Sequence, residues 1–165
     1  MGRQIVKYCS IMLLLMATNI TRAEAQTLCL GERIPDVYLL STIGTDVQSI
    51  TSDYVCLVFA HSESEPSIEA IDIFADVAAI FSNELSVVLI TPEVREAEHD
   101  ELDIYVNNQI SVAFDDGFRT FDGFGVKYIP FGVIYERRSR NIVWFGSIGQ
   151  LDTAALVEIV KINTL

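Results

Sequence analysis

Two continuous apolar runs, at 54–60 and 85–91, flank a segment in which apolar residues recur at three- and four-residue steps. Apolar runs without alternation are typical of strands that are buried on both faces of a sheet. The periodic segment, 67–81, places its apolar side chains on one side of a helix: Ile68, Ile71, Phe74, Val77, Ala78 and Phe81. A strand, a helix and a strand in this order predict a βαβ unit whose strands are parallel and neighbours or near-neighbours. The chain is therefore expected to have an α/β fold.

Shorter patterns predict the elements on either side of this unit. Residues 31–39 run into a β-prone segment, and after a turn at Gly44 a short run at 47–50 predicts a further strand. An N-terminal hairpin, or a pair of short strands, is therefore expected. The charged run that follows Pro92 predicts an exposed amphipathic helix that ends near Tyr105.

The last third of the chain predicts a strand, a hairpin and a closing helix. The strand is expected at 111–114 and is followed by an irregular or short helical connection at 118–124. Two β-prone runs, 131–135 and 141–145, are joined by polar residues, which is typical of an antiparallel hairpin. Asp152 is expected to cap the closing helix.

The first 25 residues have the features of a secretory signal peptide. Arg3 and Lys7 give a positive start, residues 11–17 form a short apolar run, and Ala23-Glu24-Ala25 matches the small-x-small cleavage pattern. A membrane anchor is the alternative, but the apolar run is far shorter than the ~20 residues of a spanning helix. We therefore expect an exported protein, periplasmic or extracellular, with one domain at 26–165 and no membrane span after cleavage.

The size and charge of the chain limit its partners. A chain of 165 residues has room for one domain with a sizeable core, and it contains no internal repeat. Its formal net charge of −12 argues against electrostatic binding to nucleic acid or anionic lipid, because both would repel an acidic surface. The expected partner is another exported protein or a peptide.

Removal of the signal would leave two cysteines, Cys29 and Cys56. In an exported chain these two thiols could form one disulfide. Cys56, however, lies inside the apolar run at 54–58, where a buried thiol that packs as a small hydrophobe is expected. Cys29 could be free, paired or intermolecular, so the state of both thiols stays open.

The junction between the first apolar run and the helix, 59–67, reads F-A-H-S-E-S-E-P-S. Serine caps and carboxylates in the first turn are what a helix start normally carries. His61, Glu63 and Glu65 would supply metal ligands only if all three faced one way, and a closed zinc site usually uses more nitrogen or sulfur ligands. A nucleophile made of Ser64 and His61 lacks an identifiable orienting group or oxyanion site. No metal and no cofactor are therefore expected.

Three motifs and the order of the elements resemble the thioredoxin-like superfamily, in particular its exported redoxin and TlpA-like branch with its peroxiredoxin relatives. Residues 31–39 are similar to G-x-x-x-P-D-hydrophobic, 59–67 align without a gap on F-W-A-x-W-C-x-P-C, and 124–130 align on Y-G-V-x-x-I-P. The resemblance implies a mixed central sheet flanked by helices. It also implies that Pro130, after Ile129, is the cis-proline that faces the active-site loop.

The chemistry departs from this resemblance at the two redox positions. Ser64 and Ser67 stand where the motif has cysteines, with Glu65 and Pro66 between them. Thiol–disulfide exchange requires an attacking thiolate and a second sulfur that resolves the mixed disulfide, and serine supplies neither. A peroxidatic cysteine in the same loop is missing as well. The domain is therefore expected to be redox-inactive, and no catalytic residue is assigned.

Two functions remain open. The first is a non-catalytic protein-binding or accessory module, which would hold its partner through His61, Glu63, Ser64, Ser67, Ile129 and Pro130. Nearby aromatic residues would be mostly core, with part of them lining a groove for an extended peptide: Phe118, Phe121, Phe124, Tyr128 and Phe131. The alternative is a protein related to thiol–disulfide oxidoreductases that uses Cys29 and Cys56, or the thiols of a partner.

Overall fold

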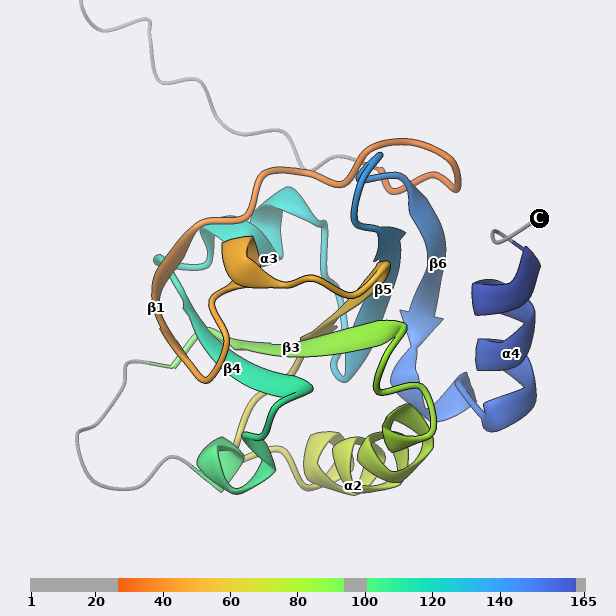
Figure 1. Ribbon diagram of the computed structural model, residues 1–165. Helices are drawn as coiled ribbons and strands as arrows, with labels where there is room; N and C mark the ends of the chain where they lie inside the picture. Colours follow the sequence, from red (N-terminus) through yellow and green to blue (C-terminus); the bar gives the residue numbers. More distant parts are fainter. Residues whose placement is uncertain (1–26, 94–100, 163–165) are drawn as a thin grey trace, which may run out of the picture.

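The computed structural model describes residues 27–93 and 101–162, and for 101, 161 and 162 it describes the backbone alone. The expected signal peptide at 1–25 lies outside the described residues, and so does the part of the charged run at 94–100, with His99. The described residues form one mixed sheet with helices on both of its faces (Figure 1).

The sheet has six strands in the spatial order β1-β4-β3-β2-β5-β6. The two strands of the βαβ unit, β2 and β3, are parallel neighbours, and β4 continues the parallel part next to β3. The outer strands β1, β5 and β6 are each antiparallel to their neighbours. The strand bounds are β1 Leu39–Ile43, β2 Tyr54–Phe59, β3 Leu85–Thr91, β4 Ile110–Asp115, β5 Phe131–Glu136 and β6 Ile142–Ser147.

The βαβ prediction is confirmed in both its strands and its helix. Every residue of β2 is buried, as expected for a central strand that is covered on both faces. The connecting helix α2 covers Glu65–Ala79, so it begins two residues earlier and ends two residues earlier than its apolar pattern predicts. Its buried residues recur at steps of four, three and four: Ser67, Ile71, Phe74 and Ala78.

The two faces of the sheet carry separate hydrophobic cores. Alternate residues of β2 divide between them, with Cys56 and Val58 on one face and Leu57 and Phe59 on the other. The first face packs against α2 and the closing helix α4 (Thr153–Ile162), and the second packs against the N-terminal segment and α3 (Arg119–Gly123). Figure 1 shows this arrangement, with α2 and α4 on one side of the sheet and α3 on the other.

The N-terminal hairpin expected from the sequence is wrong. The run at 47–50 begins with a 3₁₀ helix, η1 (Val47–Ser49), because the Asp46 carboxylate accepts a hydrogen bond from the Gln48 N–H at 2.8 Å. The β-prone segment before it does form a strand, but this strand, β1, pairs antiparallel with β4 at the edge of the sheet.

The charged run differs from its prediction in its described part. Glu101–Tyr105 is a 3₁₀ helix, η2, rather than the end of an exposed α-helix. Leu102 is fully buried in the core on the α2 face, and Asn107 ends this turn by accepting hydrogen bonds from the Gln109 and Ile110 N–H groups. One buried leucine therefore anchors this segment to the core.

The C-terminal predictions are confirmed. β5 and β6 pair as an antiparallel hairpin. The Asp152 carboxylate accepts a hydrogen bond from the Ala155 N–H at 2.8 Å, as a helix N-cap does. The connection at 118–124 contains the short helix α3, whose first N–H groups, from Thr120 and Phe121, donate to the buried carboxylate of Asp115.

Candidate functional site

The register of the sheet brings three loops to one edge. β2 and β3 are parallel, so the segments that follow Phe59 and Thr91 leave the sheet at the same end. β5 is antiparallel to β2, and Phe131 pairs with Phe59, so the segment that precedes Phe131 lies at this end too. The loop at 60–64, the residues after β3 and the Pro130 loop at 127–130 therefore meet there.

The start of α2 holds the two serines of the degenerate motif. Ser64 is at the N-cap position, but its hydroxyl forms no capping hydrogen bond, so the serine cap expected from the sequence is wrong in this detail. Pro66 lies in the first turn, where a missing N–H costs nothing. Ser67 is fully buried on the inner side of the helix, and its Oγ has no hydrogen-bond partner among the described residues.

A carboxylate that the sequence analysis missed fixes the loop before α2. Glu93 Oε1 accepts a hydrogen bond from the Ser62 N–H at 2.6 Å, and Oε2 accepts one from the Ser62 hydroxyl at 2.8 Å. His61 Nδ1 lies 2.7 Å from Glu93 Oε1, whereas the Glu63 N–H is 3.3 Å from the same nitrogen. Glu93 is therefore in contact with both Ser62 and His61 and holds the loop that precedes α2.

Glu93 was detectable from the sequence in principle. It comes two residues after β3, and the carboxyl ends of adjacent parallel strands meet at one edge of a sheet. The βαβ prediction therefore already implied that this carboxylate would lie close to the loop that follows β2.

Glu63 and Glu65, the two carboxylates that were weighed with His61 as metal ligands, do not join this cluster. Glu63 and Glu65 are exposed, and within 27–93 and 101–162 no three His, Cys, Asp or Glu side chains are arranged to hold a metal ion. His61, Glu63 and Glu65 therefore do not converge in the way that metal ligation would require. His61 instead pairs with Glu93, which lies outside the motif.

The two described cysteines are both free, so the predicted alternative of a Cys29–Cys56 disulfide is not formed. Cys56 is fully buried in the middle of β2, and burial raises the pKa of its thiol far above the ordinary range. Its thiol is therefore protonated and inaccessible in the folded protein. Cys29 is exposed, and its Sγ lies 3.7 Å from the Thr27 carbonyl oxygen.

The Pro130 loop presents open backbone and an exposed aromatic ring. The Ile129–Pro130 peptide bond is cis. The backbone N–H and C=O groups of Ile129 form no hydrogen bond with the described residues. Tyr128 is 53% exposed, and a shallow cavity of about 270 Å³ runs beside it, lined also by Lys127 and Phe145.

The aromatic cluster divides into core and surface as expected. Phe121, Phe124 and Phe131 are buried around Phe59, with ring centroids 5.0, 5.1 and 6.2 Å from its ring. The two outer members, Phe118 and Tyr128, are each 53% exposed. Each outer ring packs edge-on against a buried ring and stays exposed to solvent. The ring centroids are 6.0 Å apart for Phe118 and Phe121 and 5.4 Å apart for Tyr128 and Phe131.

Solved structures that match this arrangement include proteins described as thioredoxin-like. A thioredoxin-like protein in its oxidized form matches with a TM-score of 0.60 at 14% identity, over 83% of this chain and 96% of that chain. The chain has the thioredoxin-like fold. The thioredoxin-like resemblance inferred from the sequence is therefore confirmed at the level of the fold.

Other thioredoxin-like matches carry more specific names. A putative thiol:disulfide interchange protein DsbE from Chlorobium tepidum is 19% identical, with a TM-score of 0.56, over 73% of this chain and 86% of that one. The pneumococcal exposed lipoprotein thioredoxin Etrx1 from Streptococcus pneumoniae is 16% identical, with a TM-score of 0.50, over 67% and 84%. The sequence itself matches no profile of a known protein family and no curated protein.

The sequence resemblance and the fold can now be compared at the three loops. The loop before α2 is where the motif of the sequence resemblance carries its two cysteines, and here it carries Ser64 and Ser67 beside the Pro130 loop. No helix among the described residues is long and apolar enough to cross a membrane.

Proposed function

We propose that this chain is an exported thioredoxin-like binding module that holds an extended segment of a partner protein at the Pro130 loop and carries out no redox cycle. One observation carries the proposal. The first turn of α2 has Ser64 and Ser67 at the redox positions, and the nearest cysteine in the sequence, Cys56, is fully buried with a raised pKa. A thiolate is the nucleophile in thiol–disulfide exchange, and this site supplies none.

The binding role is supported by the surface beside that turn. An extended peptide gains affinity from main-chain hydrogen bonds and specificity from side-chain pockets. Ile129 has unused backbone groups, Tyr128 is an exposed aromatic ring, and the cavity beside them is partly apolar. Tyrosine is among the residue types that dominate binding energy at interfaces.

Export is proposed on the basis of the signal-like segment at 1–25 and of the structural likeness to a lipoprotein described as exposed. Expression with residues 1–25 fused to a reporter enzyme that works only outside the cytoplasm tests this part. We expect reporter activity, and a reporter that stays inactive would contradict export.

The redox part is tested by thiol titration and insulin reduction on the chain from residue 26. We expect one thiol, Cys29, to react in the folded protein, Cys56 to react only after unfolding, and insulin reduction to stay at background. Catalytic insulin reduction by the unmodified chain would contradict the proposal.

A double variant, S64C/S67C, serves as the positive control for the geometry. It restores both sulfurs on the first turn of α2, so we expect insulin reduction to rise above background. The matched single variant S64C lacks the resolving sulfur and should stay at background.

The binding part is tested with a set of extended, cysteine-free peptides that alternate apolar and polar residues. We expect NMR shift changes at 127–129 and binding that weakens about tenfold in Tyr128→Ala, the size expected for a truncated aromatic anchor. Ile104→Ala is the control, because this side chain is 79% exposed and belongs to η2, on the opposite face of the sheet. Equal affinity of both variants, or shift changes confined to other loops, would contradict this role.

A further inference from the structure

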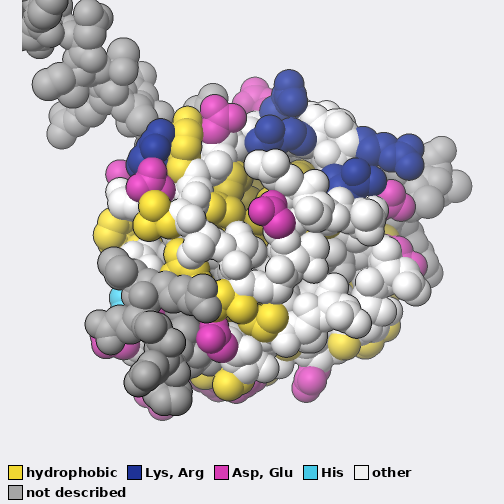
Figure 2. Space-filling model, turned by 60° about the vertical axis from the view of Figure 1, so that its left-hand side comes forward, with side chains coloured by type: hydrophobic (Ala, Val, Ile, Leu, Met, Phe, Trp, Pro, Cys, Tyr) yellow, Lys and Arg dark blue, Asp and Glu magenta, His cyan; other side chains and the backbone are white. Residues whose placement is uncertain are grey.

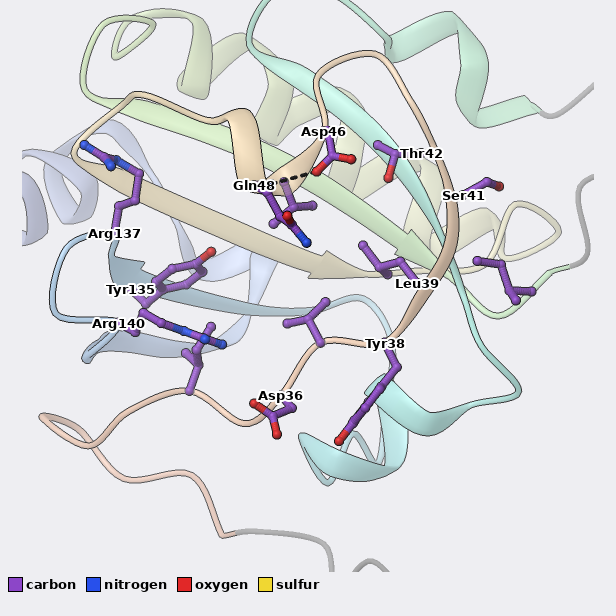
Figure 3. Close-up of a pocket in the computed structure, with 14 residues that line it drawn as sticks. Asp36, Tyr38, Leu39, Ser41, Thr42, Asp46, Gln48, Tyr135, Arg137 and Arg140 are labelled. Atoms are coloured by element: carbon purple, nitrogen blue, oxygen red, sulfur yellow. Dashed lines mark hydrogen bonds between the residues drawn. The ribbon is translucent and has the colours of Figure 1, made fainter.

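A second cavity lies away from the α2 loop, between the N-terminal segment and the turn that joins β5 to β6 (Figure 3). Its volume is about 580 Å³, within the range of about 300–1,000 Å³ that small-molecule sites occupy. Residues 34, 36–42 and 46–48 form one wall, and Tyr135, Arg137 and Arg140 form the other. None of the residues at 59–67 or 127–131 lines it.

Specific hydrogen bonds hold the N-terminal wall in place. The Ile34 N–H donates to the Arg140 carbonyl at 2.9 Å, next to a β-bridge between Arg33 and Asn141. Further along, the Thr120 hydroxyl donates to the Tyr38 carbonyl at 2.8 Å, and the Tyr38 N–H donates to the Thr120 Oγ1 at 2.9 Å. The cavity is therefore bounded by anchored backbone on both sides.

The Tyr135 hydroxyl is a donor without a partner. The residue is only 6% exposed, its ring belongs to the core on the α3 face, and its hydroxyl forms no hydrogen bond with the described residues. Among the described residues the fully buried side-chain oxygen without a partner is Ser67 Oγ, so the Tyr135 oxygen is not sealed in the core and is open to the cavity that its residue lines. Burial raises the pKa of this hydroxyl, which keeps its proton in place, while the positive charges of Arg140 and Arg137 lower the pKa in part. Both guanidinium groups are therefore close enough to act on it.

The two arginines of the cavity also have unused donors. Arg140 forms no ion pair with any described carboxylate, and Figure 3 shows its side chain beside Tyr135, extending toward the cavity. Arg137 uses its Nε–H for the Ser52 carbonyl at 2.7 Å, and no ion pair engages its remaining N–H groups within the described part of the chain. Both guanidinium groups at this cavity therefore have N–H donors that are free for a ligand.

The backbone at Arg140 fixes the turn that carries the side chain. Its φ is 63°, in the left-handed region that L-residues with long side chains rarely adopt and that glycine or asparagine adopts readily. The Arg140 N–H donates to the Glu136 carbonyl at 2.8 Å, so this conformation closes the turn between β5 and β6. The Arg140 carbonyl oxygen accepts the hydrogen bond from the N-terminal wall, and the residue lines the cavity.

We propose that this cavity binds the carboxylate group of a small organic acid with an apolar body, held by Arg140, Arg137 and the Tyr135 hydroxyl. Guanidinium groups match the geometry of a carboxylate. The walls also include apolar side chains that would cover the rest of the ligand: Ile34, Val37, Leu39 and Val47.

The charge at the rim selects against a more highly charged ligand. Asp36 and Asp46 are exposed and also line the cavity. Two carboxylates at the rim and an acidic molecule around it disfavour a doubly charged phosphate relative to a single carboxylate. Figure 2 shows Lys and Arg side chains gathered on the upper part of one face, beside a hollow that contains hydrophobic side chains.

The proposal is tested by calorimetric titration of the chain from residue 26 with hexanoate, inorganic phosphate and hexylamine. We expect saturable binding of hexanoate and none of the other two. In Arg140→Gln the dissociation constant of hexanoate should rise at least tenfold, and in Tyr135→Phe it should rise several-fold, because the phenylalanine removes one donor and keeps the ring. The control is Arg138→Gln, which removes the same charge from an exposed position in the same turn and should change the constant by less than twofold.

Several results would overturn the proposal. These are no hexanoate binding, tighter binding of phosphate than of hexanoate, binding of hexylamine with similar affinity, or an equal loss in Arg138→Gln and Arg140→Gln. If Arg140→Gln does not fold, Arg140→Lys replaces it, since lysine keeps the charge but lacks the planar donor pair. We expect Arg140→Lys to weaken hexanoate binding as well, and unchanged affinity in it would contradict the proposed carboxylate geometry.

Discussion

Ser67 sits in a position whose surroundings suit a sulfur better than a hydroxyl. The side chain is fully buried on the inner face of α2, and its Oγ has no hydrogen-bond partner among the described residues. A buried hydroxyl without a partner costs roughly 1–3 kcal/mol of stability, whereas a thiol is a weak donor and loses little. The serine therefore carries an energetic cost at the second redox position of the motif.

This cost can be measured with one substitution. Ser67→Ala removes the unpartnered oxygen and leaves the helix intact, so we expect the free energy of unfolding to rise by about 1 kcal/mol. The measurement is urea unfolding followed by circular dichroism.

The matched control is Ser52→Ala. The Ser52 hydroxyl donates to the Tyr54 carbonyl at 2.9 Å and lies 2.8 Å from the Ser86 hydroxyl, so its removal should lower stability by about 1–2 kcal/mol. A loss of stability in Ser67→Ala as large as that in Ser52→Ala would mean that the Ser67 hydroxyl is satisfied in solution.

Among the elements, the loop between β2 and α2 depends on a carboxylate that follows β3, the next strand in the chain. Glu93 accepts two hydrogen bonds from Ser62 and contacts His61. Its side chain is only 18% exposed, so these contacts are partly shielded from water. The loop that precedes the degenerate motif is thereby tied to the end of β3.

Removal of this carboxylate should loosen the loop. In Glu93→Ala we expect a loss of about 1–2 kcal/mol in the free energy of unfolding, since bonds to charged groups contribute about 1.5–3 kcal/mol and partial exposure reduces this. The Ser62 amide should exchange its hydrogen about tenfold faster. Glu63→Ala is the control, because Glu63 is exposed, and it should change stability by less than about 0.5 kcal/mol. Unchanged exchange at Ser62 in Glu93→Ala would contradict this role.

The elements with strong local patterns were predictable from the sequence. Local patterns predict β2 and β3 from their apolar runs and α2 from its three- and four-residue steps. The start of α4 is likewise predicted by its capping residue, Asp152. The run at 47–50 is different. Its β-prone residues fit a strand, but Asp46 caps a 3₁₀ turn there, and the partner of β1 comes from much later in the chain.

A site could be predicted from the sequence only where each of its residues lies within a recognisable local motif. Ser64, Ser67 and Pro130 could be located because each lies in a motif that resembles the thioredoxin-like superfamily. The carboxylate-binding cavity could not, because Arg140 and Tyr135 meet the N-terminal segment only after β5 and β6 have paired. The spacing of these residues in the sequence does not predict that the N-terminal segment lies against Tyr135 and Arg140.

For the whole molecule, the buried thiol predicts how stability changes with pH. Burial raises the pKa of Cys56 in the folded protein, whereas in the unfolded chain the thiol ionises near its ordinary pKa of about 8.5. The stabilisation is therefore fully present below about pH 8.5, and it is lost as the pH rises because only the unfolded state gives up the proton. Burial raises the pKa of Tyr135 as well, which adds a further loss above about pH 10 that the positive charges of Arg140 and Arg137 reduce.

The thiol contribution is isolated by comparing the chain from residue 26 with its Cys56→Ala variant. Above pH 8.5 the Cys56 term should cost about 1.4 kcal/mol per pH unit, so between pH 8.5 and 10 the unmodified chain should lose roughly 2 kcal/mol more than Cys56→Ala. The measurement is urea unfolding at a series of pH values. Parallel pH profiles of the two proteins would show that Cys56 ionises in the folded state.

The pairing of β1 with β4 also dictates an order of events during synthesis. β1 (Leu39–Ile43) lies at the edge of the sheet and has β4 (Ile110–Asp115) as its neighbour. Until β4 has left the ribosome, β1 has no partner, and the outer edge of β3 is a row of unpaired backbone groups that invites pairing with other chains. A chain that enters a translocation pore from its N terminus would carry β1 across first and β4 much later. β1 is therefore the first strand to be made, but it can join the sheet only after β4, whereas β2 and β3 can pair before β4 is complete.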